Sequence, residues 1–420
     1  MKLHLISRRM LIICLILCSI ITFISCGKEA NITVDKETVD NETIDKETVD
    51  NEQAATNDSK SFLESYKESG NLPSLAEVYK DKFRIGVALA KIDIENTKKA
   101  KLVATHFNSI TCENEMKADF TLDRAATLAS GDEECPVINM KQADTALSFA
   151  NENGLQMRAH TLVWHAQTPR WLFTIGYDDD PEAPFVTREV MLLRMENYIR
   201  QEIEYVNTNY PGVIYAWDVV NEAIEPGDGQ ENKIRTKNNC WYEVLGEDYI
   251  EMAFTYARKY ADPEQKLFYN DYGTYEKSKL FPICDMISKL KDKNLIDGIG
   301  MQDHISLDYP MILDYQYALN KYIELGIEIQ VTELDINTTD DTKETQQKLA
   351  SRYKLLMTIL LNSIDKNNAN ITSVTFWGLT DDRSWLNNDD SANYPLLFDK
   401  DLNPKPAYFG VLQDETIKIY

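Results

Sequence analysis

Residues 214–222 read Ile-Tyr-Ala-Trp-Asp-Val-Val-Asn-Glu, an apolar run that ends in an acidic residue. A second run of this kind, Glu-Ile-Gln-Val-Thr-Glu-Leu-Asp, covers residues 328–335. Short runs rich in β-branched and aromatic residues favour strands that are buried on both faces. The two runs deliver Glu222 and Glu333 where a parallel strand would leave the core. They predict buried parallel strands that present carboxylates at one edge of a sheet.

Six further apolar runs alternate with stretches that are long enough to hold a helix. The eight predicted strands are residues 84–90, 104–111, 155–164, 214–222, 266–271, 298–304, 328–335 and 373–379. Residues 194–207 and 346–364 have the pattern of amphipathic helices. This alternation predicts an α/β fold, a closed (β/α)8 TIM barrel with enlarged βα loops. A doubly wound open sheet is the alternative, but no glycine-rich phosphate loop follows the first predicted strand.

The composition excludes some classes of partner. The 420 residues carry a formal net charge of −24, and 43% of them are hydrophobic. A polyanion repels nucleic acid and anionic membrane surfaces, whereas a neutral polymer is not repelled. We therefore expect no nucleic-acid partner, and a chain that can build one large domain or two ordinary ones.

The N-terminus resembles a bacterial export signal with a lipidation site. Residues 11–25 form an apolar run that is short for a transmembrane helix but typical of a signal peptide. The run ends Phe-Ile-Ser-Cys-Gly, which resembles a lipobox with Cys26 as the lipidated residue, although Phe23 stands where leucine is usual. We expect an exported protein that is membrane-anchored only through Cys26, or extracellular. Ordinary cleavage that leaves a free Cys26 is the alternative. The basic residues before the run are Lys2, Arg8 and Arg9.

An acidic repeat follows the predicted signal. Residues 33–52 repeat a five-residue unit, TVDKE, TVDNE, TIDKE, TVDNE, which contains no aromatic residue. Such a segment cannot offset its ordering entropy by burial, so we expect a disordered spacer. Repeat slippage without a role is the alternative. The predicted organisation is a signal peptide at 1–25, an acidic linker at 26–58 and a catalytic barrel at 59–420.

Cysteine and histidine spacing gives no indication of a metal site. His160 and His165 are five residues apart on a predicted strand, so their side chains point to opposite faces. The four cysteines beyond residue 26 show no C-x-x-C spacing, and their three possible disulfide pairings stay open. We expect no metal and no cofactor. These cysteines are Cys112, Cys135, Cys240 and Cys284.

Glu222 and Glu333 are the strongest candidates for chemistry. A carboxylate at the end of an apolar strand is costly to bury unless it is paired or hydrogen-bonded. In a barrel, the fourth and seventh strands lie across the mouth from each other, and barrel enzymes place their chemistry there. Two facing carboxylates are the equipment of glycoside hydrolysis. Either residue alone could instead be a helix cap or a member of an ion pair.

Motifs in register with all eight predicted strands resemble those of glycoside hydrolase family 10, the endo-β-1,4-xylanases. The likeness runs from about residue 60 to residue 418. The motifs that carry it are FNSITCENEMK at 107–117, HTLVWHAQ at 160–167, WDVVNEA at 217–223, NDY at 270–272, DGIGMQDH at 297–304, VTELDI at 331–336 and FWGLTDDRSW at 376–385.

The resemblance implies a role for each matched residue. Glu222 would be the acid/base and Glu333 the nucleophile, with retention of configuration and carboxyl groups about 5–5.5 Å apart. Asn221 would bind the sugar 2-hydroxyl, and His304 would hold the nucleophile with Asp335 behind it. The other residues expected at the sugar are Gln302, His160 and Trp377 beside the cleaved bond, Glu113, Asn114, Lys117, Gln167, Trp164 and Trp385 on the glycone side, and Tyr272 on the leaving-group side. His165 is expected as a hydrogen-bonded support.

Two positions depart from the family pattern. Cys112 stands where proline is usual, which could alter the loop of Glu113 or host a disulfide. Gly273 stands where asparagine is common, so a leaving-group contact could be missing.

The implied activity is endo-hydrolysis of xylan and xylo-oligosaccharides by a monomer. Crowding around Lys117 and Trp385 leaves little room for a 6-hydroxymethyl group, which favours xylose over glucan or mannan as the alternative substrates. A surface lipoprotein that binds xylan without cutting it is the other alternative.

Overall fold

The computed structural model describes residues 61–388 and 390–420. The predicted signal peptide, Cys26 and the acidic linker lie outside this part of the chain. Among the helices that are described, none is both long enough and apolar enough to span a membrane.

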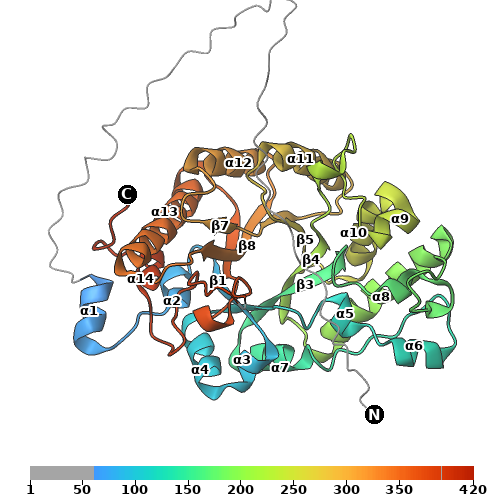
Figure 1. The fold of residues 1–420 in the computed structure, drawn as a ribbon, viewed down its shortest axis with the longest axis horizontal. Helices are drawn as coiled ribbons and strands as arrows, with labels where there is room; N and C mark the ends of the chain where they lie inside the picture. The colour runs from blue at the N-terminus through green and yellow to red at the C-terminus, as the bar shows by residue number, and fades with distance from the viewer. Residues whose placement is uncertain (1–60, 389) are drawn as a thin grey trace, which may run out of the picture. The chain divides into compact units, whose positions relative to one another are not determined.

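The strands form a closed parallel barrel, as predicted. Their order is β6-β5-β4-β3-β2-β1-β9-β8-β7, and β6 also pairs with β8, which closes the ring. Short β7 pairs with the end of β8. Figure 1 shows the strands at the centre of a ring of helices. The strands are β1 (Arg84–Leu89), β2 (Ser109–Cys112), β3 (Gln156–Trp164), β4 (Ile214–Asn221), β5 (Lys266–Asp271), β6 (Gly298–Met301), β7 (His304–Ser306), β8 (Glu328–Asn337) and β9 (Ile371–Phe376).

Three of the predicted strands have wrong boundaries, and the one at 373–379 lies at residues 371–376 in the structure. The prediction at 104–111 begins inside helix α4, which is capped by Asn96 and continues to His106. His106 is the last residue of that helix, and its buried ring contacts Tyr408, with Nδ1 and the hydroxyl 2.8 Å apart. The prediction at 298–304 is interrupted at Asp303, whose φ of 58° breaks the extended backbone and separates β6 from β7.

The helices cover the outside of the barrel. The predicted helices at 194–207 and 346–364 lie within α8 and α13, which begin after the capping hydroxyls of Thr187 and Thr342. The helices are α1 (Phe62–Ser69), α2 (Leu75–Tyr79), α3 (Lys91–Glu95), α4 (Thr97–His106), α5 (Ala118–Thr121), α6 (Arg124–Ser130), α7 (Asp144–Asn153), α8 (Arg188–Asn209), α9 (Cys240–Leu245), α10 (Tyr249–Tyr260), α11 (Lys277–Asp292), α12 (Ile312–Glu324), α13 (Lys343–Asn367) and α14 (Pro406–Val411).

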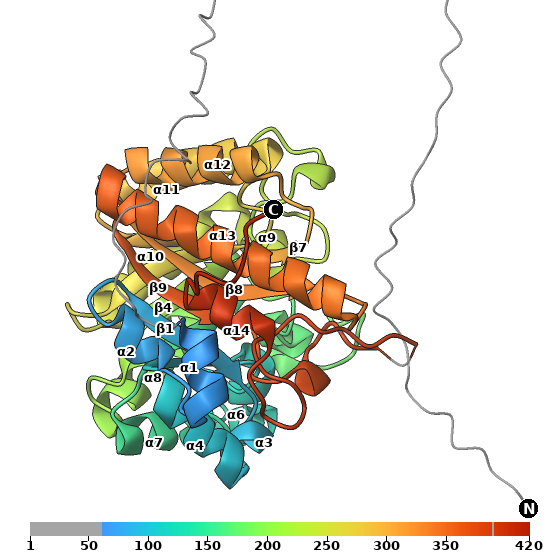
Figure 2. The same cartoon turned by 90° about the vertical axis from the view of Figure 1, so that its left-hand side faces the viewer.

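Helix α1 packs beside α14, as Figure 2 shows. The rings of Tyr66 and Phe409 are 5.7 Å apart, and the backbone N–H of Leu63 donates to Asp414 Oδ2 at 2.8 Å. The first described helix is thereby tied to the C-terminal segment at one side of the barrel.

The barrel interior is closely packed around Gly300 of β6. A Cβ at Gly300 of β6 would lie 2.2 Å from Asn270 Oδ1 and 2.9 Å from Thr332 Cγ2. Such distances exclude any side chain at this position. The absence of a side chain at Gly300 therefore gives Asn270 its place at the end of β5.

Candidate active site

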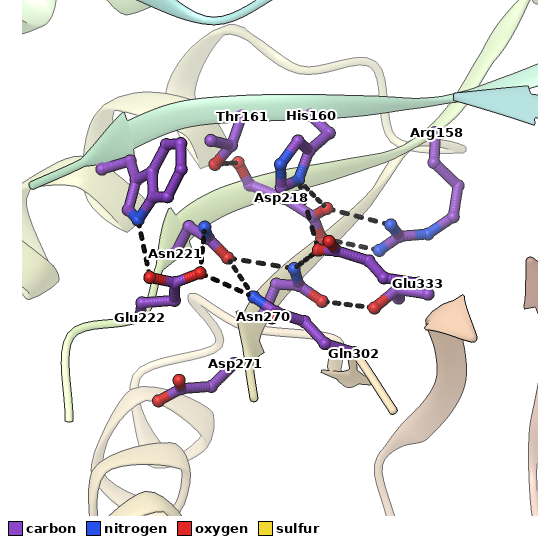
Figure 3. Close-up of polar contacts among 12 residues, drawn as sticks. Arg158, His160, Thr161, Asp218, Asn221, Glu222, Asn270, Asp271, Gln302 and Glu333 are labelled. Atoms are coloured by element: carbon purple, nitrogen blue, oxygen red, sulfur yellow. Dashed lines mark hydrogen bonds and ion pairs between the residues drawn. The ribbon is translucent and has the colours of Figure 1, made fainter. Parts of the chain in front are cut away.

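Glu222 directly follows β4 and Glu333 lies in the C-terminal half of β8, on the side of the barrel that the sequence predicts, and Figure 3 shows them within one polar network. Glu222 has a φ of 57°, which turns the chain as it leaves β4. Its backbone N–H donates to the carbonyl of Asn270 at 2.9 Å, and that of Glu333 donates to the carbonyl of Gln302 at 3.0 Å. Neighbouring strand ends therefore fix the main chain of both residues.

The Glu222 carboxylate is held by neutral donors. Trp164 Nε1 donates to Oε2 at 2.9 Å, and Gln302 Nε2 donates to Oε1 at 3.0 Å. Arg235 Nε donates to the Glu222 main-chain carbonyl at 3.0 Å, so its charge supports the turn rather than the carboxylate. The Glu222 carboxylate is thus oriented by an indole and an amide N–H group of the described residues.

Glu333 is nearly fully buried and strongly hydrogen-bonded. Asn270 Nδ2 donates to its Oε1 at 2.7 Å, and His304 Nε2 lies 3.1 Å from its Oε2. Burial by itself raises the pKa of Glu333, but the electrostatic effect of His160 and the bonds from His304 and Asn270 outweigh it and lower the pKa below its usual value. The residue is thus kept as an anion, the form that a nucleophile needs.

His304 bridges two carboxylates. Its Nδ1 lies 3.0 Å from Asp335 Oδ1, opposite the contact of Nε2 with Glu333. Burial opposes a charge on the ring, but Asp335 and Glu333 raise the pKa of His304 to about 10. Asp335 also accepts a hydrogen bond from Trp385 Nε1 at 2.7 Å. The predicted placement of Asp335 behind His304 is therefore what the structure shows.

The orientation of the Asn221 amide follows from its neighbours. Thr332 Oγ1 donates to Asn270 Oδ1 at 2.6 Å, so the amino group of Asn270 faces both Glu333 and Asn221 Oδ1, the latter at 3.0 Å. The reverse orientation of Asn221 would set its amino group against two other amino groups. The amino group of Asn221 consequently points toward Glu222, with its Nδ2 3.3 Å from Oε1.

Several important residues were not assigned a role from the sequence. Arg158 makes a two-pronged ion pair with Asp218 at 2.6 and 2.9 Å, and His160 Nδ1 lies 3.0 Å from the same carboxylate. Burial raises the pKa of Asp218, but Arg158 and His160 together lower it below its usual value. The only sign of Arg158 and Asp218 in the sequence is that each is a charged residue inside an apolar strand. Asn270 was also missed, although it lies inside a quoted motif.

Four of the six predicted glycone residues form one cluster: Lys117, Asn114, Gln167 and Trp164. Lys117 Nζ donates to Gln167 Oε1 at 2.9 Å and to Asn114 Oδ1 at 3.3 Å, and it lies 5.0 Å from the ring centre of Trp164. Burial lowers the pKa of Lys117. Burial, together with nearby acids, raises the pKa of Glu113 to about 7.

Two tryptophans cover the histidines. The ring of Trp377 lies 5.4 Å from that of His160 and 6.2 Å from that of His304, both edge-on. Trp385 lies 4.9 Å from the ring of His304 and is 58% exposed. One face of Trp385 is therefore open to solvent, whereas Trp377 is buried against His160 and His304.

Tyr272 directly follows β5, and polar contacts hold its side chain in place. Its hydroxyl donates to Glu225 Oε2 and accepts from Arg235, both at 3.1 Å. Lys279 Nζ lies 3.5 Å from its ring centre and 2.6 Å from Asp271 Oδ1. Burial raises the pKa of Asp271 to about 6 despite this ion pair.

His165 and the cysteines lie apart from the network. The His165 ring packs against Trp164, and its buried Nδ1 has no hydrogen-bond partner among the described residues. Burial lowers the pKa of His165 to about 4. The hydrogen bond expected for this support is not found at Nδ1. In the described part of the chain Cys112 is buried and unpaired, so it hosts no disulfide. The other three cysteines there are also free: Cys135, Cys240 and Cys284.

Other parts of the described chain add no catalytic candidate. No group of three or more His, Cys, Asp or Glu residues within 61–388 and 390–420 could hold a metal ion. A cavity of about 1170 Å³ lies between the segment after β7 and the start of α13, and none of the predicted site residues lines it.

Residues 74–414 match the model of Glycosyl hydrolase family 10. The chain belongs to this family. Among its family 10 relatives, endo-1,4-beta-xylanase B of Butyrivibrio fibrisolvens is 42% identical over 344 residues, which are 81% of this chain and 53% of that protein. Endo-1,4-beta-xylanase A of Thermotoga maritima is 41% identical over 355 residues, which are 82% of this chain and 31% of that protein. This chain thus spans about half the length of the first relative and about a third of the length of the second.

Solved family 10 structures agree in fold. An intracellular xylanase from Thermoanaerobacterium saccharolyticum, a mutant in complex with xylotriose, is 36% identical with a TM-score of 0.70. The match covers 82% of this chain and 99% of that one. The family resemblance and the barrel predicted from the sequence are both confirmed.

Proposed function

We propose that this chain is an endo-β-1,4-xylanase that retains the anomeric configuration. The observation that carries the proposal is the environment of Glu333, an anion held by Asn270 and His304 at the end of the strand opposite Glu222. The xylanase names of its family 10 relatives and the xylotriose complex of one of them support the substrate.

The reaction proceeds in two steps on the two carboxylates. In the first step Glu333 attacks the anomeric carbon and forms an ester, while Glu222 gives its proton to the leaving oxygen. In the second step Glu222 takes a proton from water, which hydrolyses the ester. Asn221 points its amino group to the space beside Glu222, where it binds the sugar 2-hydroxyl.

The glycone side selects the sugar. The cluster of Lys117, Asn114 and Gln167 presents donors and acceptors to hydroxyl groups, and Trp385 offers an exposed ring for stacking. Glu113, His160, Trp164, Gln302 and Trp377 complete the sugar contacts that we propose. Tyr272 receives the leaving sugar.

A reducing-end assay tests the proposal. Wild type is compared with Glu333→Ala on soluble xylan, carboxymethylcellulose and mannan, and Glu344→Ala on exposed α13 is the matched control. We expect xylan cleavage that is lost only in Glu333→Ala. Cleavage of only the other polymers would reject the substrate, and xylan binding without cleavage would indicate a non-catalytic sugar-binding protein.

We also propose that the chain is exported and anchored as a lipoprotein through Cys26, with residues 1–25 removed, 26–58 as a spacer and 59–420 as a monomeric catalytic domain. The basic, apolar and lipobox-like order of the N-terminal sequence supports this. Labelled palmitate should enter wild type and Cys284→Ser in bacterial cells but not Cys26→Ser. Equal labelling of all three proteins would reject the anchor, and unlabelled, released wild type would indicate ordinary cleavage.

A further inference from the structure

We propose that Glu276 and Tyr309 form an additional subsite for one neutral xylosyl unit of the leaving chain, and that Glu276 disfavours a uronic acid there. This inference rests on the proposed xylanase activity and adds to it a specificity among substituted xylans.

The two residues follow β5 and β7, and β6, which pairs with β5, lies between these strands in the chain. Glu276 lies in the short segment between β5 and α11, and Tyr309 lies in the segment between β7 and α12. A tight turn fixes Tyr309, because Ser306 N–H donates to its carbonyl at 2.8 Å and its own N–H donates to Ser306 Oγ at 3.2 Å. β7 begins with His304, so this turn is continuous with the catalytic centre.

Tyr309 is exposed yet held in place. Its side chain is 49% exposed, and its hydroxyl donates to Glu276 Oε1 at 3.0 Å. Buried Tyr275 supports the ring edge-on at 5.6 Å. A tyrosine that is fixed by a hydrogen bond and a buried neighbour while much of its surface stays open is suited to stack on a sugar.

Glu276 connects this tyrosine to Tyr272. A Cβ at Gly273 would lie 3.5 Å from Glu276 Oε1, so the carboxylate rests against the residue that follows Tyr272. Gly273 is the position at which the family commonly has asparagine. A leaving chain that passes Tyr272 therefore meets the Glu276 carboxylate next and the Tyr309 ring after it.

The chemistry of the pair selects a neutral pentose. The carboxylate accepts hydrogen bonds from two sugar hydroxyls, and a xylosyl ring has no hydroxymethyl group to hinder stacking. A uronic acid would bring a second negative charge to Glu276. Three cations in this region have other partners: Lys279 is paired with Asp271, Lys277 lies over the ring of Tyr317, and Arg352 donates to the carbonyl of Pro310.

The test compares substrates that do and do not reach the subsite. Tyr309→Ala should raise KM for xylohexaose about fivefold, the order expected for one aromatic contact, and shift its cleavage positions. It should leave kcat/KM unchanged for 4-nitrophenyl xylobioside, whose leaving group carries no sugar. Tyr309→Phe should keep most of the stacking, and the exposed Tyr317→Ala is the matched control.

Glu276→Gln tests the selection against charge. Its kcat/KM on glucuronoxylan relative to neutral arabinoxylan should rise about fourfold, as expected for like charges roughly 5 Å apart in water. An unchanged ratio, an unchanged xylohexaose pattern in Tyr309→Ala, or an equal effect of Tyr317→Ala would overturn the subsite while leaving the xylanase activity standing. A wild type inactive on both 4-nitrophenyl xylobioside and xylan would overturn both proposals.

Discussion

Asn270 donates a hydrogen bond of 2.7 Å from Nδ2 to Glu333 Oε1, across from the contact that His304 makes with Oε2. This bond joins the ends of β5 and β8. Glu333 is therefore held by side chains from two other strands, the amide of Asn270 on β5 and the imidazole of His304 on β7. The first prediction follows from the removal of the amide.

Asn270→Ala should lower kcat about a hundredfold, the order expected when a supporting hydrogen-bond donor is lost. Because the Asn270 bond helps to lower the pKa of Glu333, the acid limb of the pH–rate profile should move to higher pH. The profile is measured with 4-nitrophenyl xylobioside, and Asn153→Ala at the end of α7 is the control. A fall in kcat with an unmoved acid limb would contradict the assigned cause.

The two carboxylates should fail in different ways when removed. Glu333→Ala should abolish cleavage of every substrate, because no ester can form. Glu222→Ala should still release very acidic phenols in a first burst, because such leaving groups need no proton. Pre-steady-state release of 2,4-dinitrophenol distinguishes them. If Glu222→Ala lost the burst as completely as Glu333→Ala, the two roles would be wrongly assigned.

His304 makes folding stability depend on pH. Its pKa in the folded protein is about 10 against a usual value of 6.5. Because the pKa is raised, the stabilisation of the folded protein by protonated His304 is complete below pH 6.5 and is lost as pH rises toward 10. The melting temperature should fall across this window. Asp335→Asn should flatten the fall, whereas Asp401→Asn on the exposed surface should not, and equal slopes in all three proteins would refute the assignment.

Tyr315 should stabilise the turn between β6 and β7. Its hydroxyl donates to Asp303 Oδ2 at 2.6 Å, and Asp303 lies between the Gln302 and His304 side chains that contact the two carboxylates. Tyr315→Phe leaves a buried acceptor unsatisfied, which costs about 1–3 kcal/mol of unfolding free energy. Urea unfolding measures this loss, with Tyr317→Phe as the control. A change in unfolding free energy below about 0.5 kcal/mol, the usual limit for surface substitutions, would show that the bond contributes little to stability.

The sequence predicted the strands that carry the reactive groups, because each is a buried apolar run with an acid near its end. The boundary at 104–111 was wrong because the chain there mixes apolar and polar residues in a pattern that fits the end of a helix as well as a strand, and the helix capped at Asn96 continues to His106. The sequence around Asp303 likewise did not indicate its positive φ.

The residues that were missed depend on partners far along the chain. Arg158 and Asp218 are separated by 60 residues, and Asn270 and Glu333 by 63. The pairing of β3 with β4, which sets His160 opposite Asp218, is needed before these contacts can be seen. A single sequence shows charged residues inside predicted strands, but it does not show which of them meet.

Asp335 accepts hydrogen bonds from both His304 and Trp385. One carboxylate therefore serves the interior of the catalytic centre and its outermost aromatic surface together. An engineer who moved Trp385 to admit a bulkier sugar would also change the balance of charge around His304. A change at Trp385 is therefore expected to reach His304 through Asp335.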